Sequence, residues 1–268
     1  MAMFKLNRIN GASYYTVPSF EATGLVRHCI TTREGGVSSG CYSSMNLRFH
    51  CDDSRKNVLE NFRRAAQNAG MDPERLVLSH QTHGDIVRAV SSADAGNGIK
   101  FENRFNSADG LITAERGLPL VTLYADCTPV LMLDKHLGVI ASVHSGWRGT
   151  VKRIAAKAAH RMIFDYGSKH EDILCAIGPS IQLCHFEVGD DVAEIFKNEF
   201  GEDTIMKFGD RYHVSMQRAI AKQLIEAGIP ESNIDDCGIC TYCESDLLFS
   251  HRKTKGRRGN FGAFIELI

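Results

Sequence analysis

Apolar and polar positions follow two periods along this chain, and the periods predict a mixture of helices and strands. Apolar residues at three- and four-residue intervals predict an amphipathic helix over residues 54–70, which Asp53 or Ser54 can cap and which Gly70 ends. The same spacing predicts a helix over residues 151–166, with Thr150 as its cap. Two further helices are predicted for VGDDVAEIFKNEFG and VSMQRAIAKQLIEAG.

Short apolar runs between these helices predict strands. They cover residues 75–83, 119–127, 129–134, 138–144 and 172–181, together with the C-terminal FGAFIELI. Strands and helices mix along the whole length, without a linker, repeat or low-complexity tract. We therefore expect an α+β (mixed α/β) fold, built as a single layered domain over residues 1–268 with mixed β-sheets covered by helices.

Composition narrows the class of protein. The 268 residues are 43% hydrophobic and carry a net charge of −1, so we expect neither nucleic acid nor an anionic membrane as a partner. No run reaches the roughly 18 apolar residues of a membrane helix, and the N-terminal residues lack the apolar stretch of a signal peptide. The nine cysteines, an odd number, are expected to be mostly reduced thiols in a cytoplasmic protein, either a monomer or a homodimer.

Three predicted strands end in residues that bind metals. SHQTHG contains His80 and His83, YADCTP contains Cys127, and SVHSGW contains His144. Two imidazoles and one thiolate are a common zinc ligand set that leaves a fourth position for water or substrate. Spacing alone also allows an ordinary buried thiol and a hydrogen-bonded core histidine. If one strand runs through both His80 and His83, they face opposite sides of the sheet, so His80 is expected to pack or to form hydrogen bonds instead.

The turn SVHSGWRGTV suggests a site where backbone approaches a ligand, because Gly146 and Gly149 contribute no side chain to a core. Arg148 would lie near the N-terminus of the 151–166 helix, where the helix dipole favours an anion such as phosphate. Alternatively, Arg148 is an ordinary solvent-exposed arginine. Trp147 could stack on a base, or it could simply pack against its neighbours. Asp126 is a candidate to hold a ligand imidazole or accept a proton, or else a turn residue.

Several motifs, in order, resemble the laccase-domain, or multicopper polyphenol oxidase, family, whose members are described as purine nucleoside phosphorylases. They are TTREGGVSSGCYSSMNL, LSHQTHGDIV, SADGLIT, YADCTPVLMLD, VIASVHSGWRGTV, AIGPSIQLCHFEVGDDV and CTYCESDLLFSHR. The resemblance implies zinc bound by His83, Cys127 and His144. It also implies phosphate and purine nucleosides (adenosine, inosine, guanosine and S-methyl-5′-thioadenosine) as partners, with adenosine deamination as a second activity.

The resemblance further implies substrate contacts. Asn46, Arg48 and Arg33 match a family block near the active site, and Gln81 and Arg252 are candidates on the same grounds. The alternative is that Arg33, Asn46 and Arg48 are ordinary polar residues of surface turns. Asn260 stands where the family often has arginine, although Arg257 and Arg258 lie close by.

Other functions remain open at this stage. The same ligands would fit copper in a polyphenol oxidase, although no H-x-H pair accompanies them. Cys127 and His144 could serve a metal-free cysteine hydrolase, and a zinc that only holds the fold is a further alternative. His185 and Glu187, with Cys237, Cys240 and Cys243, look like a zinc deaminase set, but no proline precedes either C-x-x-C pair, so these cysteines are expected to pack as thiols.

Overall fold

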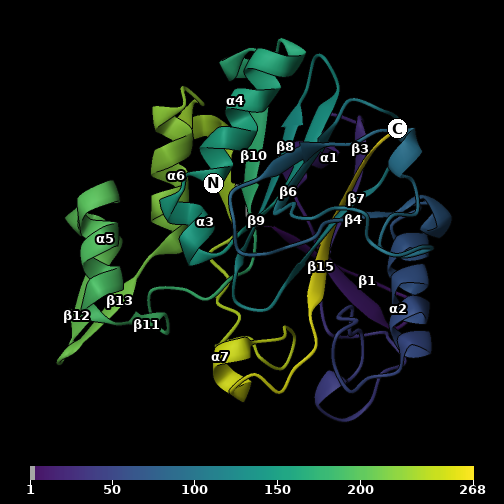
Figure 1. Cartoon of the computed structure of the whole chain (residues 1–268), viewed down its shortest axis with the longest axis horizontal. Coiled ribbons are helices and arrows are strands. Elements are labelled where there is room, and N and C mark those ends of the chain that lie inside the picture. Colours follow the sequence, from purple (N-terminus) through teal and green to yellow (C-terminus); the bar gives the residue numbers. More distant parts are fainter. Residues whose placement is uncertain (1–3) are drawn as a thin grey trace.

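Two six-stranded mixed sheets form the centre of the structure, a computed structural model that describes residues 4–268 (Figure 1). The first sheet has the order β1 (Lys5–Ile9), β2 (Ala12–Thr16), β3 (Val26–Thr31), β15 (Phe261–Leu267), β7 (Leu120–Tyr124) and β4 (Val77–Leu78). The second has the order β14 (Ile234–Asp236), β10 (Ile173–Ile177), β8 (Thr128–Asp134), β9 (Val139–Ser145), β6 (Gly110–Thr113) and β5 (Val87–Ala89). Most neighbours are antiparallel, whereas β4–β7, β5–β6 and β10–β14 are parallel pairs.

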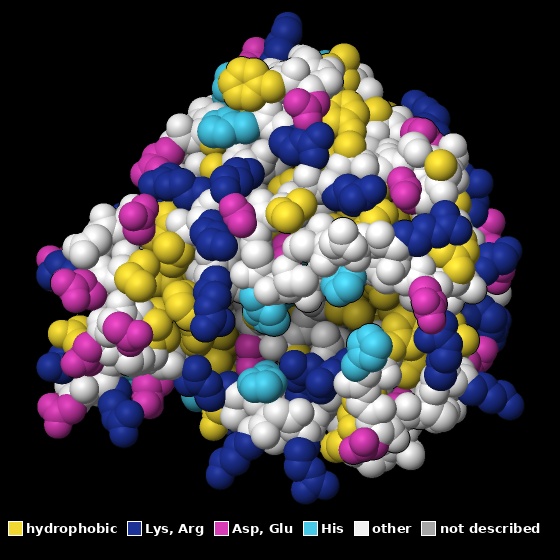
Figure 2. Space-filling model, viewed as in Figure 1, with side chains coloured by type: hydrophobic (Ala, Val, Ile, Leu, Met, Phe, Trp, Pro, Cys, Tyr) yellow, Lys and Arg dark blue, Asp and Glu magenta, His cyan; other side chains and the backbone are white. Residues whose placement is uncertain are grey.

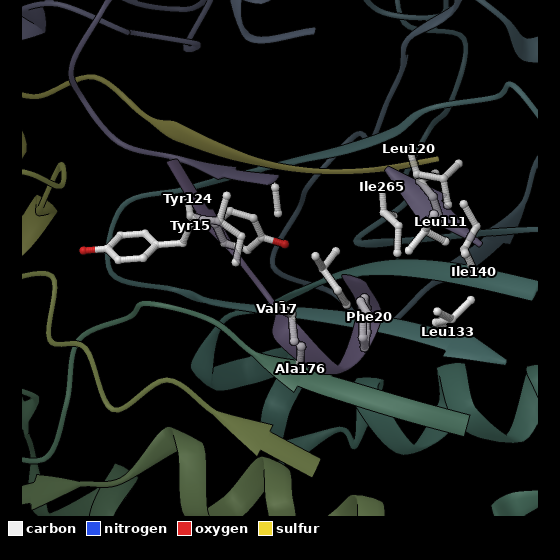
Figure 3. Packing of buried hydrophobic residues seen from close by; sticks show 14 of the residues in the cluster. Tyr15, Val17, Phe20, Leu111, Leu120, Tyr124, Leu133, Ile140, Ala176 and Ile265 are labelled. Carbon is white, nitrogen blue, oxygen red and sulfur yellow. The ribbon is translucent and has the colours of Figure 1, made fainter. Parts of the chain in front are cut away.

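The main core lies between the two sheets. Leu120 and Ile265 of the first sheet pack against Leu111, Leu133 and Ile140 of the second, and all five are fully buried (Figure 3). Alternate residues of each strand face this core because successive side chains of a strand point to opposite faces. Each buried aliphatic side chain contributes on the order of 1.5–3 kcal/mol to folding. The sheets are therefore held rigidly against each other.

Helices cover the outer face of each sheet, as expected. The first sheet is covered by α2 (Arg55–Asn68), which buries Phe62 and Ala65. Ser54 caps this helix by accepting a hydrogen bond from the Asn57 amide, and Gly70 follows it at a φ of 72°. The second sheet is covered by α4 (Ile154–Tyr166) and α6 (Met216–Glu226). The predicted mixed fold of sheets covered by helices is confirmed.

A smaller unit lies at one edge of the molecule, to the left in Figure 1. It contains the antiparallel strands β11 (Glu187–Val188), β13 (Arg211–Val214) and β12 (Ile205–Phe208), covered by α5 (Asp190–Phe200). The remaining helices are α1 (Pro18–Glu21), α3 (Trp147–Val151) and α7 (His251–Thr254). No helix within residues 4–268 has both the length and the apolar character needed to cross a membrane.

Two predicted elements are wrong in detail. The helix expected over 151–166 is two helices, α3 and α4, because Arg153 adopts a left-handed φ of 63° that breaks the hydrogen-bond ladder. Thr150 therefore lies inside α3, and Gly146 is the N-cap. The strand expected over 75–83 is limited to β4 and one isolated bridge at His80. The strands expected at 119–127, 129–134, 138–144, 172–181 and the C-terminus are confirmed as β7, β8, β9, β10 and β15.

Candidate metal centre and its cavity

His83, Cys127 and His144 meet at one end of the two sheets. One ligand atom from each lies within 4.8 Å of the other two, and the two imidazole rings are 5.1 Å apart between centroids. His144 lies on β9, in the same alternating row as Ile140, so it points toward the first sheet. Cys127 directly precedes β8, and His83 lies in the loop after β4. This donor set fits a tetrahedral metal ion with one open coordination position.

The local backbone brings these side chains together at some conformational cost. His83 has a φ of 59° and Asp126 a φ of 84°, both in the left-handed region that L-residues rarely adopt. Gly146 lies against the cluster, where an added Cβ would be 3.0 Å from His83 Cδ2 and 3.4 Å from Cys127 Sγ. Glycine at position 146 therefore lets the backbone approach the ligands closely, which accounts for one of the two glycines in the turn.

Asp109 fixes the orientation of this centre. Its carboxylate is fully buried and accepts a hydrogen bond from His144 Nδ1 at 2.9 Å. It also accepts from the backbone amides of Thr82, His83 and Gly84 at 2.9–3.0 Å. Because an ionised carboxylate only accepts, His144 carries a proton on Nδ1 and turns Nε2 toward Cys127.

The sequence left Asp126 open as a residue that holds a ligand imidazole or accepts a proton, or as a turn residue, and none of its hydrogen bonds within residues 4–268 is to an imidazole. Asp126 instead accepts hydrogen bonds from Thr241 Oγ1 and from the Arg252 backbone amide, both at 2.6 Å. Asp109 was missed although it lies in the motif SADGLIT. The signal that could have identified it is an aspartate directly before the glycine that begins β6, beside the β9 strand that carries His144.

The electrostatics of the cluster favour a thiolate. Burial would raise the pKa of Cys127, but the nearby imidazoles of His144 and His83 outweigh it and lower that pKa. Burial likewise opposes the charged form of His144, whereas Cys127 and Asp109 raise its pKa. Thiolate is the form of cysteine that binds metal and acts as a nucleophile. The cluster can therefore hold a cation or act as a thiolate–imidazolium pair.

A cavity of about 1080 Å³ opens onto this cluster. On the face shown in Figure 2, histidine side chains surround a hollow near the middle of the molecule, and basic side chains lie at its lower rim. The apolar part of the lining includes Phe49, Leu78, Phe101, Ile181 and Phe186, and the basic part includes Arg48, His251, Arg252 and Arg258. The volume suits a small organic molecule together with an inorganic anion.

Three of the predicted substrate contacts line this cavity: Arg48, Gln81 and Arg252. The Gln81 amide is bonded to the backbone of Leu123, donating to the carbonyl at 2.7 Å and accepting from the amide at 2.8 Å. It therefore fixes the loop before His83 against β7. Arg252 Nη2 donates to the Glu187 carbonyl at 3.0 Å.

The other three predicted contacts lie outside the cavity. Asn46 is fully buried, and its side chain donates a hydrogen bond to the Asp53 carboxylate and accepts one from the Asn260 backbone amide. Arg33 donates to backbone carbonyls and lines a separate hollow. Arg148 is exposed on α3, with its guanidinium 4.4 Å from the Trp147 ring centroid. Asn46 and Arg33 therefore hold loop backbone without facing the cavity, and Arg148 is the solvent-exposed arginine that the sequence also allowed.

Arg258 contributes a guanidinium close to the position where the family arginine was expected. Its side chain lines the cavity, donates to Asn260 Oδ1 and lies 3.2 Å from His251 Nδ1. Burial and the neighbouring charge of Arg48 lower its pKa to about 10, yet it stays charged at neutral pH. Arg48 and Arg258 thus place two positive charges in the cavity.

Comparisons with known proteins agree with this architecture. The chain is 36% identical to a purine nucleoside phosphorylase of Bacteroides thetaiotaomicron, over 85% of this chain and 86% of the relative. It is 33% identical to an adenosine deaminase named RL5 from an unidentified prokaryote, over 83% and 87%. The crystal structure of hypothetical protein YfiH of Bacillus licheniformis superposes with a TM-score of 0.92 at 29% identity, covering 99% of both chains. The model of the multi-copper polyphenol oxidoreductase laccase family matches residues 27–268. The chain therefore belongs to this family.

Proposed function

We propose that this protein is a zinc-dependent purine nucleoside phosphorylase with adenosine deaminase as a second activity. Its substrates would be adenosine, inosine, guanosine and S-methyl-5′-thioadenosine. The names of the relatives support the reaction class. The observation that carries the proposal is the cavity, which combines a metal-ligand cluster, several arginines and apolar walls in one space.

The residues of the cavity suit the two reactants. Phosphate would be bound near Arg48 and Arg258, since guanidinium groups pair with phosphate oxygens in a fixed, often bidentate geometry. The purine has flat apolar faces, and Phe49, Phe101 and Phe186 provide apolar surface for it. Arg252 would position the cavity wall, since its guanidinium donates a hydrogen bond to the Glu187 carbonyl.

His83, Cys127 and His144 would hold the zinc ion. Bound there, zinc would supply a Lewis acid for a phosphate oxygen and lower the pKa of a bound water to about 7. Asp109 keeps the proton on His144 Nδ1, so that Nε2 remains available as a ligand. Asp126 positions the cavity wall through Thr241 and Arg252.

Phosphorolysis forms a bond between a phosphate oxygen and ribose C1′ while the C1′–N9 bond breaks. The electron pair leaves with the purine, which takes up a proton. In deamination, water adds to C6 of adenine and ammonia leaves. Both reactions need an oxygen nucleophile and charge stabilisation in one cavity.

Zinc-replete protein should convert inosine and phosphate to hypoxanthine and ribose 1-phosphate, measured by chromatography. His83→Ala and Cys127→Ser should each abolish turnover. Cys41→Ser, the same change at an exposed cysteine outside the cavity, should leave it unchanged. Hypoxanthine formed equally fast without phosphate, or no turnover by protein shown to contain zinc, would contradict the proposal.

One observation favours a second candidate, a metal-free cysteine hydrolase. The lowered pKa of Cys127 and its contact with His144 resemble an activated nucleophile and its base. That enzyme would be inactivated by thiol alkylation and unaffected by chelators, whereas the zinc enzyme loses activity to chelators and regains it with zinc. Copper, which the family description suggests, would instead give an electron paramagnetic resonance signal and phenol turnover.

A further inference from the structure

A second group of metal-binding side chains lies apart from the first centre. Cys184 and His185 come from the loop after β10, and Cys240 and Cys243 from the loop after β14. One ligand atom of each lies within 4.8 Å of all the others. We propose that these four residues form a closed tetrahedral zinc site that joins the two loops.

The separations between the donor atoms suit a tetrahedral ion. His185 Nδ1 is 3.1 Å from Cys184 Sγ, 3.4 Å from Cys243 Sγ and 3.9 Å from Cys240 Sγ, and the sulfurs of Cys184 and Cys243 are 3.9 Å apart. Zinc bonds of about 2.3 Å to sulfur and about 2.0–2.1 Å to nitrogen require tetrahedral edges of about 3.8 Å between sulfurs and about 3.6 Å between nitrogen and sulfur. The nitrogen–sulfur distances bracket their expected value, and the distance between the sulfurs of Cys184 and Cys243 is close to the value expected for two sulfurs.

Sequence and local structure favour the same assignment. Cys240 and Cys243 have the C-x₂-C spacing typical of structural zinc sites, and a turn closed by the Glu244 amide and the Cys240 carbonyl at 2.9 Å holds them. The His185 ring stacks on Tyr242 with centroids 4.0 Å apart, which fixes the ring while Nδ1 faces the sulfurs. Cys237, also in C-x-x-C spacing with Cys240, lies outside the group and packs against the main core.

Four protein ligands leave no open position, which distinguishes a structural site from a catalytic one. The zinc deaminase interpretation also needs a free carboxylate at Glu187, but that group pairs with Arg211 at 2.8 Å. For Cys240 and Cys243, the proposal departs from the expectation that these cysteines pack as thiols, because three sulfurs and one imidazole nitrogen lie close together.

The site would hold one wall of the large cavity in place. Thr241, between the paired cysteines, donates to Asp126, the neighbour of Cys127. On the other loop, the His185 and Glu187 carbonyls accept from the Arg252 guanidinium. Zinc at this position would thus brace the segments that position Asp126 and Arg252, without touching a substrate.

Metal stoichiometry tests the proposal in the full-length protein. Protein produced with zinc and purified under reducing conditions should contain two equivalents per chain. The double variant Cys184→Ser/Cys243→Ser should contain one, and Cys41→Ser should contain two. Because Cys184 and Cys243 are exposed, the double variant is expected to fold, which its circular dichroism spectrum would verify.

Cobalt substitution separates this site from the first centre. In a His83→Ala/Cys127→Ala background, cobalt should still bind at one equivalent, with intense near-ultraviolet absorption from several thiolate ligands and the visible bands of tetrahedral cobalt. Adding Cys184→Ser should weaken the near-ultraviolet absorption. Nucleoside turnover is not read in this assay, so its result is independent of the proposed function.

Two results would overturn the second site. One is a single zinc equivalent in the wild-type protein that disappears in the His83→Ala/Cys127→Ala variant. The other is a Cys184–Cys243 disulfide, found by mass spectrometry in protein that was supplied with zinc and never exposed to an oxidant.

Discussion

Replacing Asp109 by asparagine tests whether this carboxylate orients the metal centre. The change keeps the shape of the side chain but substitutes an NH₂ donor for one acceptor oxygen. One carboxylate oxygen accepts from the His83 amide and His144 Nδ1, and the other from the amides of Thr82 and Gly84. In either orientation, the NH₂ group therefore faces at least one backbone N–H that cannot accept.

The magnitude follows from these contacts. Each hydrogen bond to a buried charged acceptor contributes about 1.5–3 kcal/mol, so loss of one or two should destabilise the protein by about 3 kcal/mol. If the amide NH₂ donates to Nδ1 of His144, the imidazole proton moves to Nε2 and blocks the ligand nitrogen. Loss of such an orienting group weakens metal binding by about 10–100-fold.

Zinc affinity would be measured by competition with a chromophoric chelator, and stability by chemical denaturation of the metal-free protein. Asp134→Asn is a matched control, because Asp134 is equally buried but lies at the far end of β8. Only one of its carboxylate oxygens accepts a hydrogen bond, so an amide can fit there without opposing a donor. Asp109→Asn with the zinc affinity of the wild type would refute the reasoning.

Three further predictions concern single contacts. Gly146→Ala should lower zinc affinity about tenfold or more, because the added Cβ would displace the His83 ring. Thermal stability should change little, since alanine adopts the φ of −76° at this position freely. Unchanged zinc affinity would show that the contact between position 146 and His83 is unimportant. Arg258→Gln should raise the KM for phosphate more than that for inosine, whereas Arg257→Gln, an exposed change outside the cavity, should alter neither. Burial lowers the pKa of His28 from 6.5 to about 4, so below pH 6.5 the unfolded chain binds a proton that the folded protein does not. Between pH 7 and pH 4, His28 should therefore lower the free energy of unfolding by about 3 kcal/mol. Denaturation of His28→Gln across this range should show a correspondingly smaller fall, and equal slopes for both proteins would contradict the assignment.

The strands and helices were predictable where one period continues over many residues. The strand expected over 138–144 is β9, which is buried along its whole length, and the 54–70 helix has its cap, apolar face and terminal glycine in sequence order. The break at Arg153 was not predictable, since arginine is a good helix former and nothing in the local pattern marks the left-handed φ at this position.

The candidate site was predictable in its metal-binding residue types but not in its supporting contacts. Histidine and cysteine at the ends of three predicted strands indicated the ligands, and the structure brings His83, Cys127 and His144 together. The choice between Asp109 and Asp126 depends on which strand lies beside β9, which is a property of sheet order. Convergence of the residues around Cys184 and Cys240 depends on two loops that are more than fifty residues apart.

The position of β15 has a consequence for synthesis of the protein. This strand, formed by residues 261–267, lies between β3 and β7 and pairs with both. During translation, β3 and β7 therefore emerge long before the strand that joins them, and the edges that pair with β15 stay unpaired until residues 261–267 leave the ribosome. Unpaired strand edges recruit other chains, so a product truncated before Phe261 should aggregate rather than fold.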